Sequence, residues 1–231
     1  MASVKFGGGI VGMAGKIAGN VFARNRSGSY VRSWAKPVNT NTEAQTKIRA
    51  VTAALFTLWN ATLTAAQRLA WAQYAAGVTM VNRLGESMNL SGYNQFVRSN
   101  ACRLYNDITA VLPGPTLLAL PEKDTTAVAT VTAATKAVSL AFDDAMEWLN
   151  ETGGALVVYA GQPQNANVNF FNGPWHLCGK VLGNDTTPPT TPAAMTLPWE
   201  VAAGQKCFFR ARIMRADGRL SEFFRFESSA S

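Results

Sequence analysis

The chain has 231 residues, of which 48% are hydrophobic and 15% charged, and its net charge is +7. This length is enough for one large domain or two ordinary ones, and the hydrophobic content excludes a disordered chain. No apolar run reaches the roughly 18 residues of a membrane span, so we expect a soluble protein without membrane contact. The charge divides unevenly, because residues 1–112 carry 12 Lys and Arg against 3 Asp and Glu, whereas residues 113–231 carry 9 against 11.

The first 41 residues form a basic, glycine-rich segment. Each glycine costs a helix about 1 kcal/mol relative to alanine, so we expect an extended arm that becomes ordered when its backbone pairs with a partner. A turn at Ser27-Gly28 precedes the alternating run Tyr30–Trp34, which is typical of a short strand. We predict that the arm docks on an acidic protein surface through Phe6, Ile10, Lys16, Phe22, Arg24, Arg26, Tyr30, Arg32 and Trp34.

Residues 42–112 are predicted to be helical. Thr42–Gln45 and Thr64–Gln67 both fit capping boxes, which predicts two helices joined as a hairpin, the second ending at Gly77. Ser91 is expected to cap a third helix. The apolar faces that we expect in the core are Ile48, Val51, Leu55, Leu58 and Trp59, then Leu69, Trp71 and Tyr74, then Phe96, Val97, Ala101 and Leu104.

A proline-rich linker is predicted at residues 113–121, because proline does not continue a helix. Beyond it, Asp217-Gly218 predicts a tight hairpin. The spacing of the strands favours a β-sandwich of immunoglobulin or fibronectin type III style over residues 122–231, and hence an α+β chain. The predicted strands are Thr126–Thr132, Ala137–Phe142, Ala155–Ala160, Trp175–Leu182, Met195–Val201, Gln205–Arg215 and Arg219–Phe226.

The sequence motifs for catalysis, for nucleotide binding and for metal binding are incomplete. Gly15-Lys16 suggests a phosphate loop, but Ile17 stands where Ser or Thr is required. His176 is the single histidine, so a zinc site or a Ser-His-Asp triad lacks parts. The three cysteines have no CxxC spacing and are expected to be free, buried thiols. An acidic cluster at Asp143, Asp144, Glu147 and Glu151 matches no EF-hand and is expected to be a solvated loop rather than a calcium site. We predict no catalytic, cofactor or metal site, and no enzymatic activity.

Several runs in residues 15–105 resemble a known family. They are the arm Gly15–Arg32, the helical pattern Trp59…Leu63-Thr64…Gln67-Arg68…Trp71, and Ser91-Gly92-Tyr93-Asn94-Gln95-Phe96. Together they are similar to a family encoded among the structural genes of tailed phages and prophages, in which a C-terminal immunoglobulin-like domain also occurs. The resemblance implies a virion component made in a bacterial host, and it supplies no catalytic residues.

Within a virion, we expect a capsid-bound decoration or cement protein, present in multiple copies and in contact with the major capsid protein or other virion proteins. A neck or tail component is the nearest alternative. A carbohydrate- or cell-surface-binding module is another, with its site in the loop Asn165–Trp175, which is rich in Asn and aromatic residues. The third alternative is nucleic-acid binding by the basic, aromatic arm.

Overall fold

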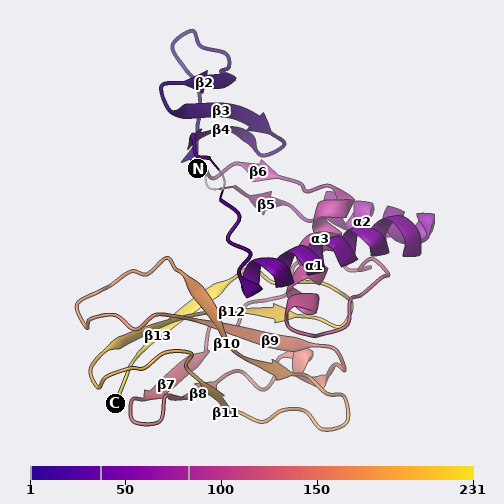
Figure 1. Ribbon diagram of the computed structural model, residues 1–231. Helices are drawn as coiled ribbons and strands as arrows, with labels where there is room; N and C mark the ends of the chain where they lie inside the picture. The colour runs from indigo at the N-terminus through magenta and orange to yellow at the C-terminus, as the bar shows by residue number, and fades with distance from the viewer. Residues whose placement is uncertain (1, 37, 83) are drawn as a thin grey trace.

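Helices separate two groups of antiparallel sheets in the computed structural model, which describes residues 2–36, 38–82 and 84–231. Figure 1 shows a small sheet (β1–β4) at the upper end, the helices beneath it, and two larger sheets at the lower end. The chain is thus a mixed helix-and-sheet protein with several antiparallel sheets, as the α+β prediction requires. The helices are α1 (Glu43–Thr57), α2 (Ala65–Gly77), α3 (Gly92–Tyr105), a π-helical turn η1 (Leu58–Thr62) and a 3₁₀ turn η2 (Glu147–Asn150).

The strands of the described residues belong to four sheets. An arm sheet has the order β1-β4-β3-β2, a small hairpin pairs β5 with β6, and the two larger sheets have the orders β10-β9-β12-β13 and β11-β8-β7. The first half of the chain contributes β1 (Ala2–Ser3), β2 (Gly15–Ile17), β3 (Asn20–Asn25), β4 (Gly28–Ser33), β5 (Met80–Val81) and β6 (Ser87–Met88). The second half contributes β7 (Val128–Thr132), β8 (Ala137–Ala141), β9 (Ala155–Gly161), β10 (Trp175–Leu182), β11 (Ala193–Thr196), β12 (Lys206–Met214) and β13 (Phe224–Ser229).

The arm is folded on itself, which corrects the prediction of an extended segment that needs a partner to become ordered. β2 and β3 are joined by a two-residue turn in which Ala18 and Gly19 both have positive φ. That conformation matches the twist of a tight hairpin. The next turn is fixed by Asn25, whose side-chain oxygen accepts a hydrogen bond from the Ser27 backbone N–H at 2.9 Å. The glycines therefore supply turns within the chain, where we had expected them to ease pairing with another molecule.

The three predicted helix caps are present. Thr64 and Gln67 form a complete capping box, and Ser91 accepts a hydrogen bond from the Asn94 N–H. At the start of α1 only half of the box forms, because the Gln45 side chain accepts a hydrogen bond from the Thr40 hydroxyl instead.

The helical hairpin prediction needs a further correction, because α1 and α2 both pack chiefly against α3. Their predicted apolar faces are only partly covered: Leu55, Trp71, Tyr74 and Phe96 are buried together. Ile48 and Leu69, by contrast, are 54% and 60% exposed.

The main core lies between the two larger sheets. Alternate residues of β7 and β8 point inward, among them Val131 and Leu140, and they meet Phe209 and Ile213 from β12. The tight turn predicted at Asp217-Gly218 is present, closed by hydrogen bonds between Arg215 and residues 218–219. The last strand begins later than predicted, at Phe224, because residues 219–223 form only an isolated bridge to Met214.

The helices and the larger sheets share a buried interface. Cys102 of α3 packs with Val157, Met214 and Leu220 on the outer face of the four-stranded sheet. Arg103 donates hydrogen bonds to the backbone oxygens of Thr109, Gly153 and Arg215 at 2.7–3.1 Å.

The proline-rich segment 113–121 is also packed, with Gly114 against the backbone of α2 and Pro115 and Pro121 buried. It is therefore a structured connection, although the predicted domain boundary itself stays a prediction.

Candidate functional site

Six of the nine predicted docking residues lie on the two faces of the arm sheet, and three lie in its connecting segments. Residues directly opposite one another in an antiparallel pair point to the same side, and Lys16, Val21 and Arg32 form such a row. Trp34 lies on this side too, since the Lys16 ammonium is 5.6 Å from the centre of its ring. We call Lys16, Tyr30, Arg32 and Trp34 the basic–aromatic face.

The other predicted docking residues are not on that face. Phe22 and Arg24 alternate to the opposite side of the sheet, beside Val31. Phe6 and Ile10 lie in the irregular segment between β1 and β2, and Arg26 lies in the turn between β3 and β4. The structure thus brings four of the nine predicted residues onto one surface and distributes the remaining five elsewhere on the arm.

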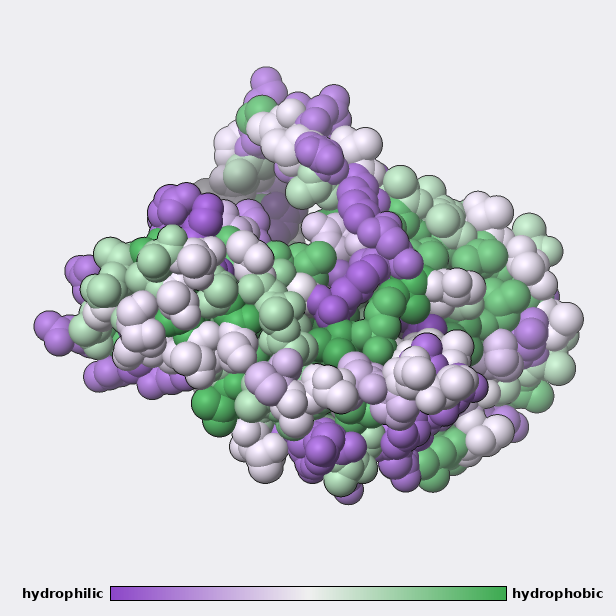
Figure 2. Space-filling view, turned by 90° about the horizontal axis from the view of Figure 1, so that it is seen from below, coloured by the Kyte–Doolittle hydropathy of each residue, from purple (hydrophilic) through white to green (hydrophobic). Residues whose placement is uncertain are grey.

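Among residues 2–36 of the arm, no apolar side chain reaches full burial. Phe6, Val21, Phe22 and Tyr30 are half-buried, while Trp34 is 56% exposed. Figure 2, which views the molecule from below, also shows hydrophobic residues gathered in patches on that face of the body. An exposed Trp34 beside partly covered aromatic rings favours contact of the arm with another protein.

The arm sheet touches the body through the β5–β6 hairpin. The Lys5 ammonium lies 3.0 Å from the Glu86 carboxylate, and the Asn82 amide donates to the Ser27 backbone oxygen at 3.4 Å. Hydrogen bonds from Asn82 and Lys5 lower the pKa of Glu86 below its ordinary value. A cavity of about 410 Å³ separates the two elements, with Tyr30 at its rim. Lys16, Arg32 and Trp34 are exposed, so the basic–aromatic face is open beyond Tyr30.

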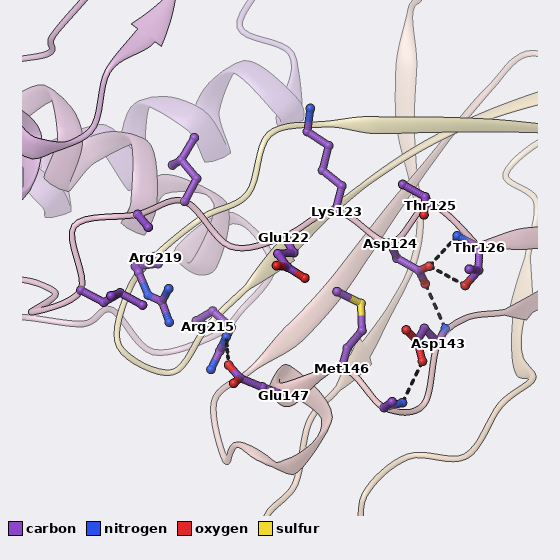
Figure 3. Close-up of a pocket in the computed structure, with 14 residues that line it drawn as sticks. Glu122, Lys123, Asp124, Thr125, Thr126, Asp143, Met146, Glu147, Arg215 and Arg219 are labelled. Carbon is purple, nitrogen blue, oxygen red and sulfur yellow. Dashed lines mark hydrogen bonds and ion pairs between the residues drawn. The ribbon is translucent and has the colours of Figure 1, made fainter.

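A charged pocket of about 500 Å³ lies where the segment 117–126 passes the loop 143–147 (Figure 3). Asp124 is buried in its wall, and the carboxylate accepts hydrogen bonds from the Thr126 N–H and hydroxyl at 2.8 Å and from the Asp143 N–H at 3.1 Å. Asp143 in turn accepts from the Ala145 N–H. These two carboxylates hold loop backbone in place.

Two further charges of that pocket, Arg215 and Glu147, pair with one another. Arg215 binds both Glu147 and Glu151, and these bonds, with Glu151 the larger contributor, raise the Arg215 pKa. Lys123 pairs with Glu222 at 2.7 Å, outside the pocket wall. Two members of the predicted acidic cluster are thus committed to an arginine. Within the described residues, no group of three or more His, Cys, Asp and Glu side chains is placed to hold a metal ion.

The single histidine and the cysteines lie outside this pocket. The His176 ring packs edge-on against Trp199 with ring centres 4.8 Å apart. Cys102, Cys178 and Cys207 are free thiols, as predicted, although Cys178 is only partly buried. Burial raises the pKa of Cys178 to about 12 and that of Cys207 to about 11, so both thiols hold their protons at neutral pH. No helix among the described residues combines the length and hydropathy needed to cross a membrane.

An arginine–aromatic layer on the outer face of the four-stranded sheet was not predicted from the sequence. The Arg210 guanidinium lies 4.3–5.4 Å from the ring centres of Tyr159, Trp175 and Phe223. Arg212 lies 3.4 Å from the centre of the Phe223 ring. The signal was the alternation Phe208-Arg210-Arg212 along one predicted strand, which places both arginines on one face.

Comparisons with known proteins give little further guidance. No family model matches the chain, and no curated protein matches it. Two solved structures show a slight likeness: a family 76 glycoside hydrolase from a bovine Bacteroides thetaiotaomicron strain (TM-score 0.31, 16% identity, 46% of this chain and 20% of that one), and the adhesin domain of Epf from Streptococcus pyogenes (TM-score 0.29, 15% identity, 48% and 33%). The chain thus spans a third or less of either protein, and at these scores neither likeness carries an argument about fold or activity.

Proposed function

We propose that this chain is a non-enzymatic structural protein of a tailed-phage virion, bound to the capsid shell as a decoration protein through its arm sheet. The main support is the basic–aromatic face, which presents Lys16, Arg32 and the 56% exposed Trp34 on a sheet that projects from the body. The resemblance of residues 15–105 to phage structural proteins points in the same direction. The protein acts in multiple copies, each in contact with the major capsid protein or another virion protein.

Electrostatics and apolar contact have separate roles in this attachment. Lys16 and Arg32 attract an acidic surface and set the orientation of approach, whereas Trp34 supplies apolar area, worth about 25 cal/mol per Å² when buried. Strand β2 is an edge of the arm sheet, so its backbone is free to pair with a strand of the partner.

The two larger sheets are proposed to form an immunoglobulin- or fibronectin type III-like sandwich that extends away from the shell. Seven strands, β7–β13, divide into sheets of four and three around one core, a division typical of such domains. The sandwich lies at the opposite end of the molecule from the arm sheet (Figure 1), which suits a module that stands clear of the docking surface.

Particle incorporation of a docking variant and a matched control tests the attachment. The docking variant combines Arg32→Glu with Trp34→Ala. The control combines Arg68→Glu with Phe56→Ala, which alters the same residue class on α2 and an equally exposed aromatic on α1. Tagged proteins are produced during phage growth, particles are purified on a density gradient, and copy number is measured by mass spectrometry.

We expect the control to incorporate at the normal copy number and the docking variant to fall at least tenfold. On the order of hundreds of copies per particle support a shell position, whereas about a dozen or fewer assign the chain to the neck or tail. Normal incorporation of the docking variant would show that the arm sheet is not the attachment element. Absence of the unaltered chain from purified particles would overturn the virion role itself.

A further inference from the structure

The outer face of the four-stranded sheet is divided into a covered half and an open half. Over the covered half, Cys102 and Ile108 pack on Ala155 and Val157. The open half holds the arginine–aromatic layer and the loop 162–174, which connects β9 to β10. The open half is separate from the arm sheet, and the attachment proposed above leaves it without a role.

Three arginines of this region have no acidic partner. Arg210, Arg212 and Arg225 form no ion pair with any carboxylate of the residues that the structure describes. The Nε atoms of Arg210 and Arg212 are buried without a hydrogen-bond partner. Aromatic rings offset part of this charge by cation–π contact, yet an anion would find several guanidinium groups and no carboxylate already bound to them.

A pocket of about 150 Å³ opens at the edge of this layer. It is lined by the rings of Phe170, Phe171, Trp175 and Phe208, with Arg225 beside them. The Arg225 guanidinium is 5.5 Å from the centre of the Phe170 ring, and its hydrogen bonds to Phe171 and Asn172 are long, at 3.4 Å. Phe170 is 69% exposed. An exposed ring and an arginine with only long hydrogen bonds therefore lie side by side in the lining of this pocket.

The wall of the pocket depends on a glycine. The Phe171 ring lies directly over Gly161, and a Cβ at that position would overlap the ring. Phe171 also packs edge-on against Trp175 and parallel to Phe208, with ring centres 5.1 and 5.9 Å apart. The loop is thus held by three contacts that fix the positions of its aromatic rings before any ligand arrives.

We propose that this pocket binds one residue of an acidic polysaccharide, a sugar that carries a carboxylate. Phe170 and Trp175 supply rings on which the apolar face of a sugar stacks, and Arg225 supplies a planar donor pair that matches a carboxylate. The pocket is smaller than those of drug-sized ligands, which suits a single sugar ring.

The rim favours a sugar over nucleic acid. Asn169 and Glu227 line the pocket, and the oxygens of both side chains can accept hydrogen bonds from sugar hydroxyls. The Glu227 carboxylate is paired with the Lys206 ammonium at 2.8 Å, so it adds little repulsion toward a single sugar carboxylate. The open arginines nevertheless make single-stranded DNA the competing ligand that the experiment must include.

Binding of the full chain to immobilised polysaccharides tests the site. Biolayer interferometry compares polygalacturonate, which carries carboxylates, with neutral dextran and with single-stranded poly(dT), at fixed salt. The site variants are Phe170→Ala, Arg225→Gln and Gly161→Ala. Two matched controls are Phe56→Ala, a 59% exposed ring on α1, and Arg24→Gln, an exposed arginine of the arm sheet.

We expect polygalacturonate to bind and dextran to bind at least tenfold more weakly. Phe170→Ala and Arg225→Gln should each weaken binding about tenfold, the size of a lost stacking or charged contact of roughly 1.4 kcal/mol. Both controls should bind as the unaltered chain does. Circular dichroism of Phe170→Ala should be unchanged because that ring is exposed, so its loss of binding cannot be assigned to unfolding.

Four outcomes would overturn the site. Equal losses in the site variants and the controls would mean that polygalacturonate binds the net positive charge at large. Equal binding of dextran would remove the role of the carboxylate, and tighter binding of poly(dT) than of polygalacturonate would assign the layer to nucleic acid. No binding of polygalacturonate by the unaltered chain would exclude the acidic sugar directly.

Discussion

The arm sheet and the C-terminal sheets are built from the same kind of strand, yet only one of them has a core. In β12, Phe209 and Ile213 alternate inward and are 0% and 1% exposed, because a second sheet covers them. In β3, Phe22 alternates in the same way but is only half-buried, because no layer covers that face. The period of a strand therefore states which residues share a face, and a covering layer decides whether that face becomes a core or a contact surface.

The largest expected difference between the two regions is in the cost of removing a ring. Phe209→Ala should destabilise the chain by about 3–5 kcal/mol, since it leaves a cavity between packed sheets. Phe22→Ala should cost less than about 1 kcal/mol, the size of a cross-strand contact on an open sheet. Urea unfolding followed by tryptophan fluorescence measures both. Similar losses in the two variants would show that the open face of the arm sheet is already covered in solution, for example by a second copy.

A buried arginine links the helices to the C-terminal sheets. Arg103→Met removes the hydrogen bonds that a buried guanidinium donates to the oxygens of Thr109, Gly153 and Arg215, which should cost about 2–3 kcal/mol. Arg68→Met on α2 is the control, with an expected effect near zero.

The interface with the helices should also stabilise the C-terminal sheets. Residues 122–231 produced alone should unfold cooperatively but at a lower midpoint than the full chain, because Val157 and Met214 lose their cover. An unchanged midpoint would make the interface energetically irrelevant and the modules independent.

The ion pair between Glu151 and Arg215 should make the stability of the C-terminal region depend on pH in the acidic range. Burial alone would raise the Glu151 pKa, but hydrogen bonds from Arg215 and the Ala216 N–H hold it below its ordinary value. A lowered pKa stabilises the fold above the ordinary value and loses that contribution as the pH falls through the folded-state pKa. Glu151→Gln should therefore cost about 1 kcal/mol at pH 7, since solvent screens this partly exposed pair.

That difference should shrink as the pH falls below the ordinary pKa of 4.5 and through the lowered pKa of the folded state. Thermal unfolding over a pH series from neutral to acidic measures it. Glu147→Gln is the matched control, because Glu147 binds the same arginine but is 77% exposed. A difference between Glu151→Gln and the unaltered chain that stays constant with pH would mean that the carboxylate acts by packing and not by charge.

Sequence patterns located most of the regular elements but not their surroundings. Capping residues at Thr64 and Ser91 and the turn at Asp217-Gly218 were visible because they act over a few neighbouring residues. The half-formed box at Thr42 and the exposure of Ile48 were not, because each depends on what packs nearby. An apolar stripe on a helix gives the direction of a face and leaves open how far another element covers it.

The candidate sites divide along the same line. Lys16, Arg32 and Trp34 were predicted individually, but only strand register shows that they share a face apart from Phe22. The arginine–aromatic layer joins residues from four segments that are far apart in the chain, such as Tyr159 and Phe223. The spacing of neighbouring residues does not predict contacts between segments that are so far apart.

The smallest expected effect concerns the few contacts that hold the arm sheet to the body. Lys5→Gln removes the ion pair with Glu86, which is exposed and open to salt, so the midpoint of global unfolding should not move. The arm sheet should instead open more often, because little else ties it to β5–β6. Hydrogen exchange of the β3 and β4 amides should become faster while that of β9 and β12 stays the same. Added salt should reproduce the effect in the unaltered chain. The control is Lys136→Gln, which breaks a similarly exposed ion pair with Glu200 in the C-terminal region. It should leave hydrogen exchange in the arm unchanged. Unchanged hydrogen exchange in the arm of Lys5→Gln would contradict this expectation. The turns within the arm sheet would then be enough to keep it folded, without support from the body.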